Sequence, residues 1–196
     1  MADLLELVVG EGTEFKLLLE SAPANIKAIL NSSIRSYTSP SSAFSGTFGR
    51  ENNVNLFRFF RMYGKLSLKP LVLKLALQSE ELAKSYGTML GFAISYLSQE
   101  NLSPEQLTSY LGLCEKAILQ RASPKLIHDI GVAVLTLHKI RQKSPIPIPE
   151  VQKLEVSLHT ADSLEKIFAA INEIAKINSI LSPRNKNKWA YSQLPA

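Results

Sequence analysis

The chain has 196 residues, of which 45% are apolar, with 22 Lys and Arg against 17 Asp and Glu and a single Cys. This length and composition allow a sizeable buried core, which excludes collagen-like, mucin-like and fully disordered proteins. Because Cys114 has no second Cys to pair with, no disulfide can form within the chain. A reducing, intracellular location is therefore expected, in the cytoplasm or in a virion.

Charge is distributed unevenly along the chain. The first twenty residues hold five acids and one Lys, a net charge of −4, and since the whole chain carries +5, the remainder carries +9. Basic residues are concentrated in residues 50–74, in residues 116–143 and in the last fifteen residues. Such a division favours contacts between chains or with polyanions.

The N-terminal part predicts an acidic helical arm over residues 1–35, with two short helices around residues 13–20 and 24–34. Residues 36–53 are rich in Ser and contain Gly and Pro, so they predict a flexible loop. A short helix is expected over residues 53–63, where Gly64 would end it.

Residues 54–144 predict a helical core in which Ser followed by Pro marks helix starts, as at Ser103 and Ser123. Gln106 completes a capping box with Ser103. The run of alternating leucines after Leu66 resembles a strand, but Pro70 followed by good helix formers favours a helix. Gly87 and Gly91 lie four apart in a helix that starts after Ser79, where they indicate close approach of another helix.

Beyond the core, the three alternating prolines of residues 145–150 predict a stiff linker. A C-terminal helical segment is expected over residues 151–182, in which Asp162 with Glu165 caps a last long helix that ends at about Leu181. Residues 183–196 form a basic tail. The whole chain is predicted to be all-α, a compact bundle of about six to eight helices.

The segment from Asn55 to Tyr63 interleaves bases with aromatic residues, and basic neighbours continue to Lys74. A basic row on one helix face attracts phosphates, and aromatic side chains at its edge can stack on bases. An amphipathic helix with core aromatics and solvated arginines is the competing interpretation. The basic end of the helix after Pro124 has a similar alternative, because cations suit a helix C-terminus.

The tail carries Trp189, the only Trp of the chain, which predicts docking on the protein itself, on a second copy or on RNA. The candidate nucleic-acid contacts are the following bases and stacking residues: Arg50, Arg58, Arg61, Lys65, Lys69, Arg141, Lys143, Phe57, Phe59 and Trp189.

A heptad-like seam in the final helix is the candidate oligomerisation surface, with one polar residue that could fix the register between chains. The same spacing is also typical of a single helix packed within one domain. The seam consists of Leu164, Ile167, Ile171, Ile174, Asn178 and Leu181.

Motifs for enzymatic chemistry are not found. Cys114 falls on the apolar face of its helix, which suits a buried side chain rather than a reactive thiolate. The three His residues lack metal-ligand spacing, and no phosphate-loop or nucleophile motif occurs. No catalytic residue, metal or cofactor is predicted.

In its organisation, with an acidic arm, a helical core and a Pro-linked C-terminal element, the chain resembles the small, basic, all-helical nucleoproteins and matrix proteins of RNA viruses. This resemblance assigns no individual residues. We therefore expect a non-enzymatic structural protein that self-associates and binds nucleic acid, above all RNA, without sequence preference. The alternatives are a helical adaptor for a protein partner, whose basic face is merely solvated, and a peripheral binder of anionic membranes.

Overall fold

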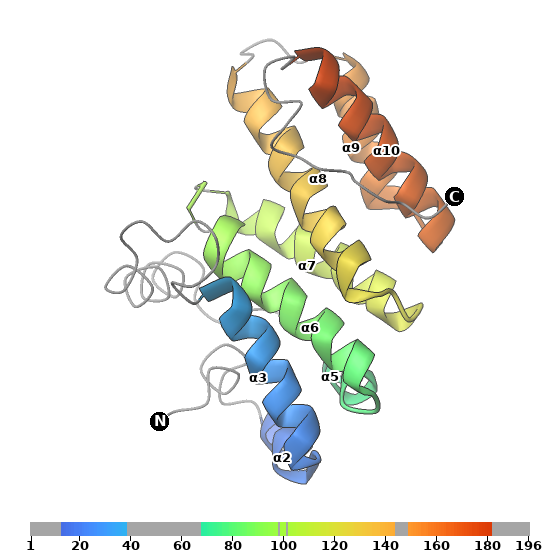
Figure 1. Cartoon of the computed structure of the whole chain (residues 1–196). Coiled ribbons are helices and arrows are strands. Elements are labelled where there is room, and N and C mark those ends of the chain that lie inside the picture. Colours follow the sequence, from blue (N-terminus) through green and yellow to red (C-terminus); the bar gives the residue numbers. More distant parts are fainter. Residues whose placement is uncertain (1–12, 39–67, 98, 101, 144–148, 182–196) are drawn as a thin grey trace. The chain divides into compact units, whose positions relative to one another are not determined.

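The computed structural model describes residues 13–38, 68–97, 99–100, 102–143 and 149–181, and over these residues the chain is helical without a β-strand. The predicted all-α helical bundle is thus confirmed (Figure 1). The chain divides into two compact units, residues 1–135 and 136–196, so the division falls inside a helix rather than in the Pro-rich linker.

The helices of the first unit are α2 (Thr13–Ser21), α3 (Ala24–Thr38), α5 (Pro70–Ala76), α6 (Glu80–Phe92), the π-helix η1 (Ala93–Leu97), α7 (Pro104–Leu119) and the first part of α8 (Pro124–Lys143). The second unit contains the rest of α8, α9 (Pro149–Thr160) and α10 (Leu164–Leu181). Both strand-like and helical readings were open for the leucine run, and α5 shows that it is a helix begun by Pro70.

Serine side chains start the core helices as the sequence predicts. Ser79 accepts a hydrogen bond from the backbone N–H of Leu82 at 3.2 Å. The capping box at the start of α7 is complete, because Ser103 accepts from Gln106 N–H and the Gln106 side chain accepts from Ser103 N–H. Each cap satisfies N–H groups that a first helical turn otherwise leaves without a partner.

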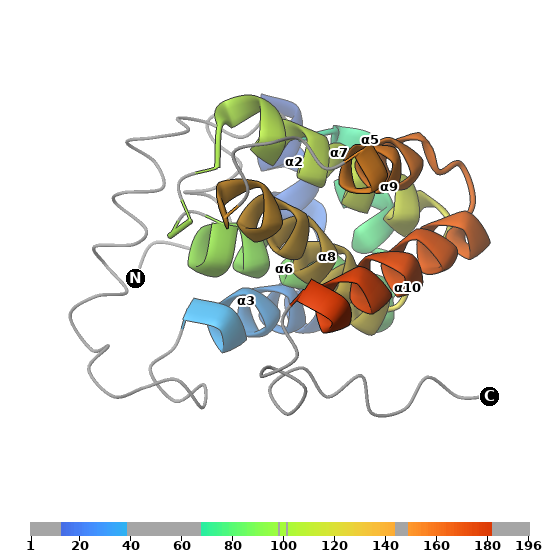
Figure 2. The same ribbon diagram turned by 90° about the horizontal axis from the view of Figure 1, so that it is seen from above.

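Helix α3 packs directly on α6, beside which it runs in both views (Figures 1 and 2). A Cβ added at Gly87 would lie 2.5 Å from Ser33 Cβ and 2.8 Å from the carbonyl oxygen of Leu30. One added at Gly91 would lie 3.0 Å from Tyr37 Cβ. The two glycines therefore give α3 its close approach to α6, which confirms the packing role expected for them.

The start of the expected flexible loop is in fact helical, because α3 continues to Thr38. Tyr37 accounts for the extension: its ring packs at 6.2 Å from the ring of Phe92 and at the same distance from that of Tyr96. Packing of the Tyr37 ring stabilises the last turn of α3 by more than the low helix propensity of the neighbouring Ser residues destabilises it. The helix therefore continues into the Ser-rich segment. Residues 39–53 lie outside the described residues.

The last long helix expected to run from Asp162 to about Leu181 corresponds to α10, and the segment that precedes it holds a further helix, α9, which begins within the expected linker at Pro149. Pro at a first helical position loses no hydrogen bond, so the last of the three prolines starts a helix instead of extending the linker. Val151 and Leu158 are buried on one face of α9, and Leu154 between them is half-buried.

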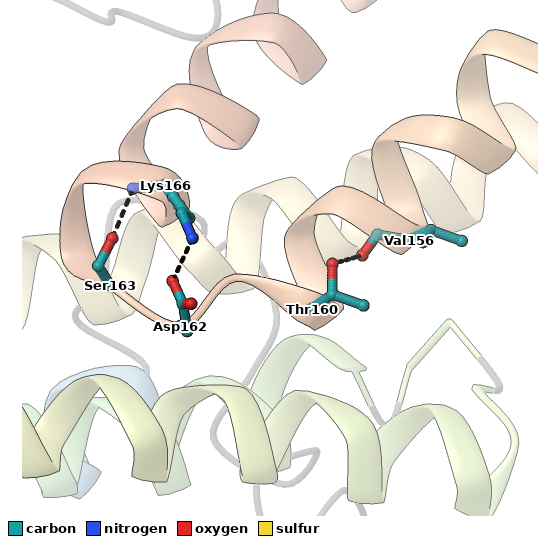
Figure 3. Close-up of polar contacts among 5 residues, drawn as sticks. All are labelled: Val156, Thr160, Asp162, Ser163 and Lys166. Atoms are coloured by element: carbon teal, nitrogen blue, oxygen red, sulfur yellow. Dashed lines mark hydrogen bonds and ion pairs between the residues drawn. The ribbon is translucent and has the colours of Figure 1, made fainter.

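Two side chains lie at the start of α10. Ser163 accepts the N–H of Lys166 at 3.4 Å, and the Asp162 carboxylate pairs with the Lys166 ammonium at 2.7 Å (Figure 3). The helix begins one residue later than expected, at Leu164, so Ser163 stands at the capping position.

The remaining structural expectations fall outside the described residues: the helix over residues 53–63, residues 145–148 of the linker and the tail from residue 183. Among the helices of the part that is described, none is both long enough and apolar enough to cross a membrane.

Filling the space at Gly87 should destabilise the first unit. We expect Gly87→Ala to lower the free energy of unfolding by about 2 kcal/mol, because the added methyl group meets backbone as well as side-chain atoms of α3. The matched control is Gly112→Ala in α7, where an added Cβ meets nothing within 4 Å. This control should gain about 0.5–1 kcal/mol from helix propensity alone. Urea unfolding followed by circular dichroism measures both, and equal effects would contradict the close approach.

Candidate functional site

Most of the candidate nucleic-acid contacts lie outside the residues that the structure describes: Arg50, Phe57, Arg58, Phe59, Arg61, Lys65 and Trp189. Lys143 is the last residue of α8, and the placement of its side chain is not described. Lys69 and Arg141 can be located, and they belong to different compact units. The proposed basic surface is therefore not assembled from the described residues.

Lys69 precedes Pro70 at the start of α5 and contacts Glu115 of α7 through two groups. Its backbone N–H donates to Glu115 Oε1 at 2.7 Å, and its ammonium lies 4.0 Å from Oε2. The Glu115 side chain is only 1% exposed, whereas that of Lys69 is 65% exposed. A buried carboxylate needs such partners, so this contact has a structural role that sequence analysis did not predict.

Arg141 donates a hydrogen bond to Glu155, which joins the end of α8 to α9 within the second unit. Both side chains are partly exposed, so the pair is screened by solvent and contributes little stability. Lys69 and Arg141 are thus each paired with a carboxylate of their own unit, and a phosphate would have to compete with that carboxylate.

The apolar seam of α10 packs within the chain. Ile167, Ile171 and Ile174 are each at most 4% exposed, while Leu164 and Asn178 are half-buried, and α10 contacts α9. The side chain of Leu181 is not described. Burial within one chain accounts for the heptad spacing without a second copy.

Cys114 is fully buried in α7, as its position on the apolar face predicts. Burial raises the pKa of its thiol, against the opposing effect of the hydrogen-bonding contact with the Tyr110 side chain. A thiol in this environment stays protonated, which is the opposite of what a nucleophile needs.

A cluster of aromatic rings around His128 was not anticipated from the sequence. The Tyr37 hydroxyl lies 3.0 Å from His128 Nδ1, and the His128 ring makes an edge contact with Phe92 at a centroid distance of 5.5 Å. Tyr96, carried by the π-helix, stacks on Phe92 at 4.9 Å. The contacts join α3, α6, η1 and α8, all within the first unit.

Gly131 makes room for this cluster. A Cβ at this position would lie 2.6 Å from Phe92 Cδ1, so the absence of a side chain lets the Phe92 ring lie against α8. Gly131 stands three residues after His128, hence on the same helix face. A Gly one turn from a His on an otherwise apolar helix is the sequence signal that could have indicated this contact.

Burial dominates the electrostatics of the cluster. Burial lowers the pKa of His128, against the opposing effect of Asp129, so the imidazole is neutral at physiological pH. Burial raises the pKa of Asp129, although His128 and Lys125 oppose it. A neutral imidazole has one unprotonated nitrogen, and in the tautomer with Nδ1 unprotonated this atom accepts a hydrogen bond from the Tyr37 hydroxyl. The cluster is suited to holding α3 against α8.

Metal binding has no visible basis in the described residues, among which no group of three or more His, Cys, Asp or Glu side chains could hold an ion. Comparison with known proteins finds no family model, no curated protein and no solved structure that matches the chain. The interpretation of the described residues therefore depends on their geometry alone.

Removing the Glu115 carboxyl group, which accepts the Lys69 N–H, should destabilise the fold more than replacing it with a neutral amide. We expect Glu115→Ala to lower the free energy of unfolding by about 2–3 kcal/mol, since it leaves a backbone donor without a partner. Glu115→Gln keeps an oxygen that can accept this N–H and should cost less. Burial raises the pKa of Glu115, against the hydrogen bond and charge of Lys69.

That direction also predicts a pH dependence. The folded state holds the Glu115 proton where the unfolded chain has lost it, so the unfolding free energy falls as pH rises above the carboxyl's ordinary value of 4.5. Glu115→Gln should remove this part of the slope in urea titrations at successive pH values. A parallel slope for the two proteins would contradict the assignment.

His128 should contribute a pH dependence of the opposite sign to the free energy of unfolding. Because its folded-state pKa is lowered, the unfolded chain binds the proton more readily, and stability should fall as pH drops below the ordinary value of 6.5. His128→Gln removes this titration while keeping a polar side chain near Tyr37. Unfolding measured between pH 5 and pH 7.5, about the range in which His titrates, should show a flatter profile for the variant, and an unchanged profile would refute the assignment.

Proposed function

We propose that this protein is a non-enzymatic structural component that associates with copies of itself and binds nucleic acid, above all RNA, through backbone phosphates. The observation that supports this proposal is the division of charge into a first segment of −4 and a remainder of +9. Clustered bases supply a sequence-independent attraction to phosphates. Such a nucleocapsid-like or matrix-like protein would act in the cytoplasm or within a virion.

The basic and aromatic segment containing Arg58 and Arg61 is the main candidate contact in this proposal. Phe57 and Phe59 would stack on bases, which is tolerant of sequence because every base has an aromatic face. Lys69 and Arg141 are secondary contacts, because each is already paired with a carboxylate of its own unit. Phosphates therefore gain less at these two positions than the sequence alone suggests.

The internal pairing of Lys69 and Arg141 is also the observation that favours the alternative, a helical adaptor for a protein partner. In that case the remaining bases would be solvated and would show no particular affinity for nucleic acid. Purification without nuclease distinguishes the two functions, since bound RNA raises the ratio of absorbance at 260 nm to that at 280 nm above the value for protein alone.

Neutralising two candidate contacts should weaken RNA binding and its salt dependence together. We expect Arg58→Ala with Arg61→Ala to reduce the slope of log K against log salt by about 1.4, because each phosphate contact on single-stranded RNA contributes about 0.7. Fluorescence anisotropy with two labelled RNAs of different sequence and equal length measures this, and both RNAs should respond alike.

The matched control removes the same amount of charge elsewhere. Lys166→Ala with Lys176→Ala takes two exposed bases from α10, where each pairs with a neighbouring acid of its own chain. This variant should retain the wild-type slope. Two results refute phosphate binding by the segment that contains Arg58 and Arg61: an equal salt slope for both double variants, or wild-type RNA binding that is the same at low and physiological salt.

A further inference from the structure

Two exposed leucines lie on neighbouring helices of the first unit. Leu17 of α2 is 60% exposed and Leu71 of α5 is 65% exposed, and these two helices pack against each other. Of the other large apolar side chains exposed within the described residues, Leu119 lies on α7 and Val156 on α9. A single exposed apolar residue is ordinary, and these two are singled out because their helices contact each other.

Charged residues frame the two leucines with opposite signs. On α2, Glu14 and Glu20 stand three residues before and after Leu17, and both are exposed. On α5, Lys74 stands three residues after Leu71 and is exposed as well. Residues three apart share a helix face, so α2 presents an acidic apolar ridge and α5 a basic apolar ridge.

Local pairing does not cancel the acidic ridge. Glu20 lies 3.9 Å from the ammonium of Lys16 on the same helix, but both side chains are more than half exposed. An exposed pair of this kind contributes little and exchanges partners readily. The carboxylates of Glu14 and Glu20 therefore remain available to a positive surface brought against α2.

We propose that the face formed by α2 and α5 is a two-fold interface with a second copy of this chain. In a two-fold arrangement the α2 ridge of one copy meets the α5 ridge of the other, and the same contact occurs twice. Leu17 then packs near the partner's Leu71, while Glu14 and Glu20 face the partner's Lys74. RNA is a poor occupant, since the two carboxylates repel phosphates.

This inference rests on the self-association in the proposed function and locates its surface on α2 and α5. It differs from the sequence-based candidate, because the α10 seam is buried within the chain. In this arrangement the acidic arm expected over residues 1–35 contributes two specific contact residues, Glu14 and Glu20.

The test is sedimentation velocity on nuclease-treated, RNA-free protein over a range of concentrations. Leu17→Lys and Leu71→Lys should each weaken dimer formation by about a hundredfold, because the interface contains each position twice. Val156→Lys is the matched control, an equally exposed apolar residue in the second unit, and should dimerise as the wild type does. Circular dichroism melts confirm that all three variants are folded.

Charge reversal provides a second, independent test. Glu14→Lys with Glu20→Lys should weaken the dimer by about fivefold, as should Lys74→Glu alone. Combining the three changes in one chain restores opposite signs across the interface and should recover most of the lost affinity. If the charge reversals weaken the dimer and the combined variant does not regain affinity, the proposed pairing of α2 with α5 is wrong.

Further outcomes distinguish this inference from the proposed function. A wild type that stays monomeric at every concentration, or leucine variants that associate like the wild type, overturns the interface even if RNA binding is intact. Dimerisation by the wild type only when another protein is added also overturns it. RNA binding is measured separately on the monomeric Leu17→Lys variant with an oligonucleotide too short for two copies, and should stay within about twofold of wild type.

Discussion

The close approach of α3 to α6 is the constraint on which the first unit depends. At Gly87 and Gly91 the helix surface of α6 has no side chains, so α3 lies against its backbone. Because α3 lies so close to α6, Tyr37 near the C-terminal end of α3 can place its hydroxyl next to His128 of α8. A side chain at either glycine would push α3 outward and withdraw Tyr37 from the aromatic cluster. One local feature of α6 therefore determines how three helices meet.

Polar groups inside the first unit then make this packing specific. Glu115 binds the N–H of Lys69 and so fixes where α5 begins relative to α7, while Ser85 of α6 donates to the carbonyl of Ala122 at 2.7 Å in the turn between α7 and α8. A shift of one helix by a turn would leave these buried groups without partners, at a cost larger than each bond contributes. The Tyr86 hydroxyl is buried without a hydrogen bond in the described structure, and its raised pKa follows from burial and from the nearby Glu115.

Local rules could be read from the sequence, whereas contacts between distant residues could not. The Ser caps, Pro70 and the glycine pair were predictable because each acts through its own helix or through simple steric size. The start of α9 was missed although Pro149 obeys the same rule as the other starts, because two further prolines made the stretch look extended. The bond from Tyr37 to His128 spans 91 positions, and the π turn before Tyr96 interrupts a periodicity that assumes regular helix. The pairing of Lys69 with Glu115 could not be predicted either, because the two residues lie 46 positions apart and meet only in the folded chain.

Charge separation links the proposed self-association to the proposed RNA binding. If the acids of α2 faced the basic runs of the same chain, they would compete with phosphates for those bases. In the proposed dimer, Glu14 and Glu20 would instead face Lys74 of the second copy. Assembly would then raise the local density of bases without exposing additional acids. Because counterion release scales with the number of phosphates neutralised, an assembled array would bind a long RNA more tightly than separate copies do.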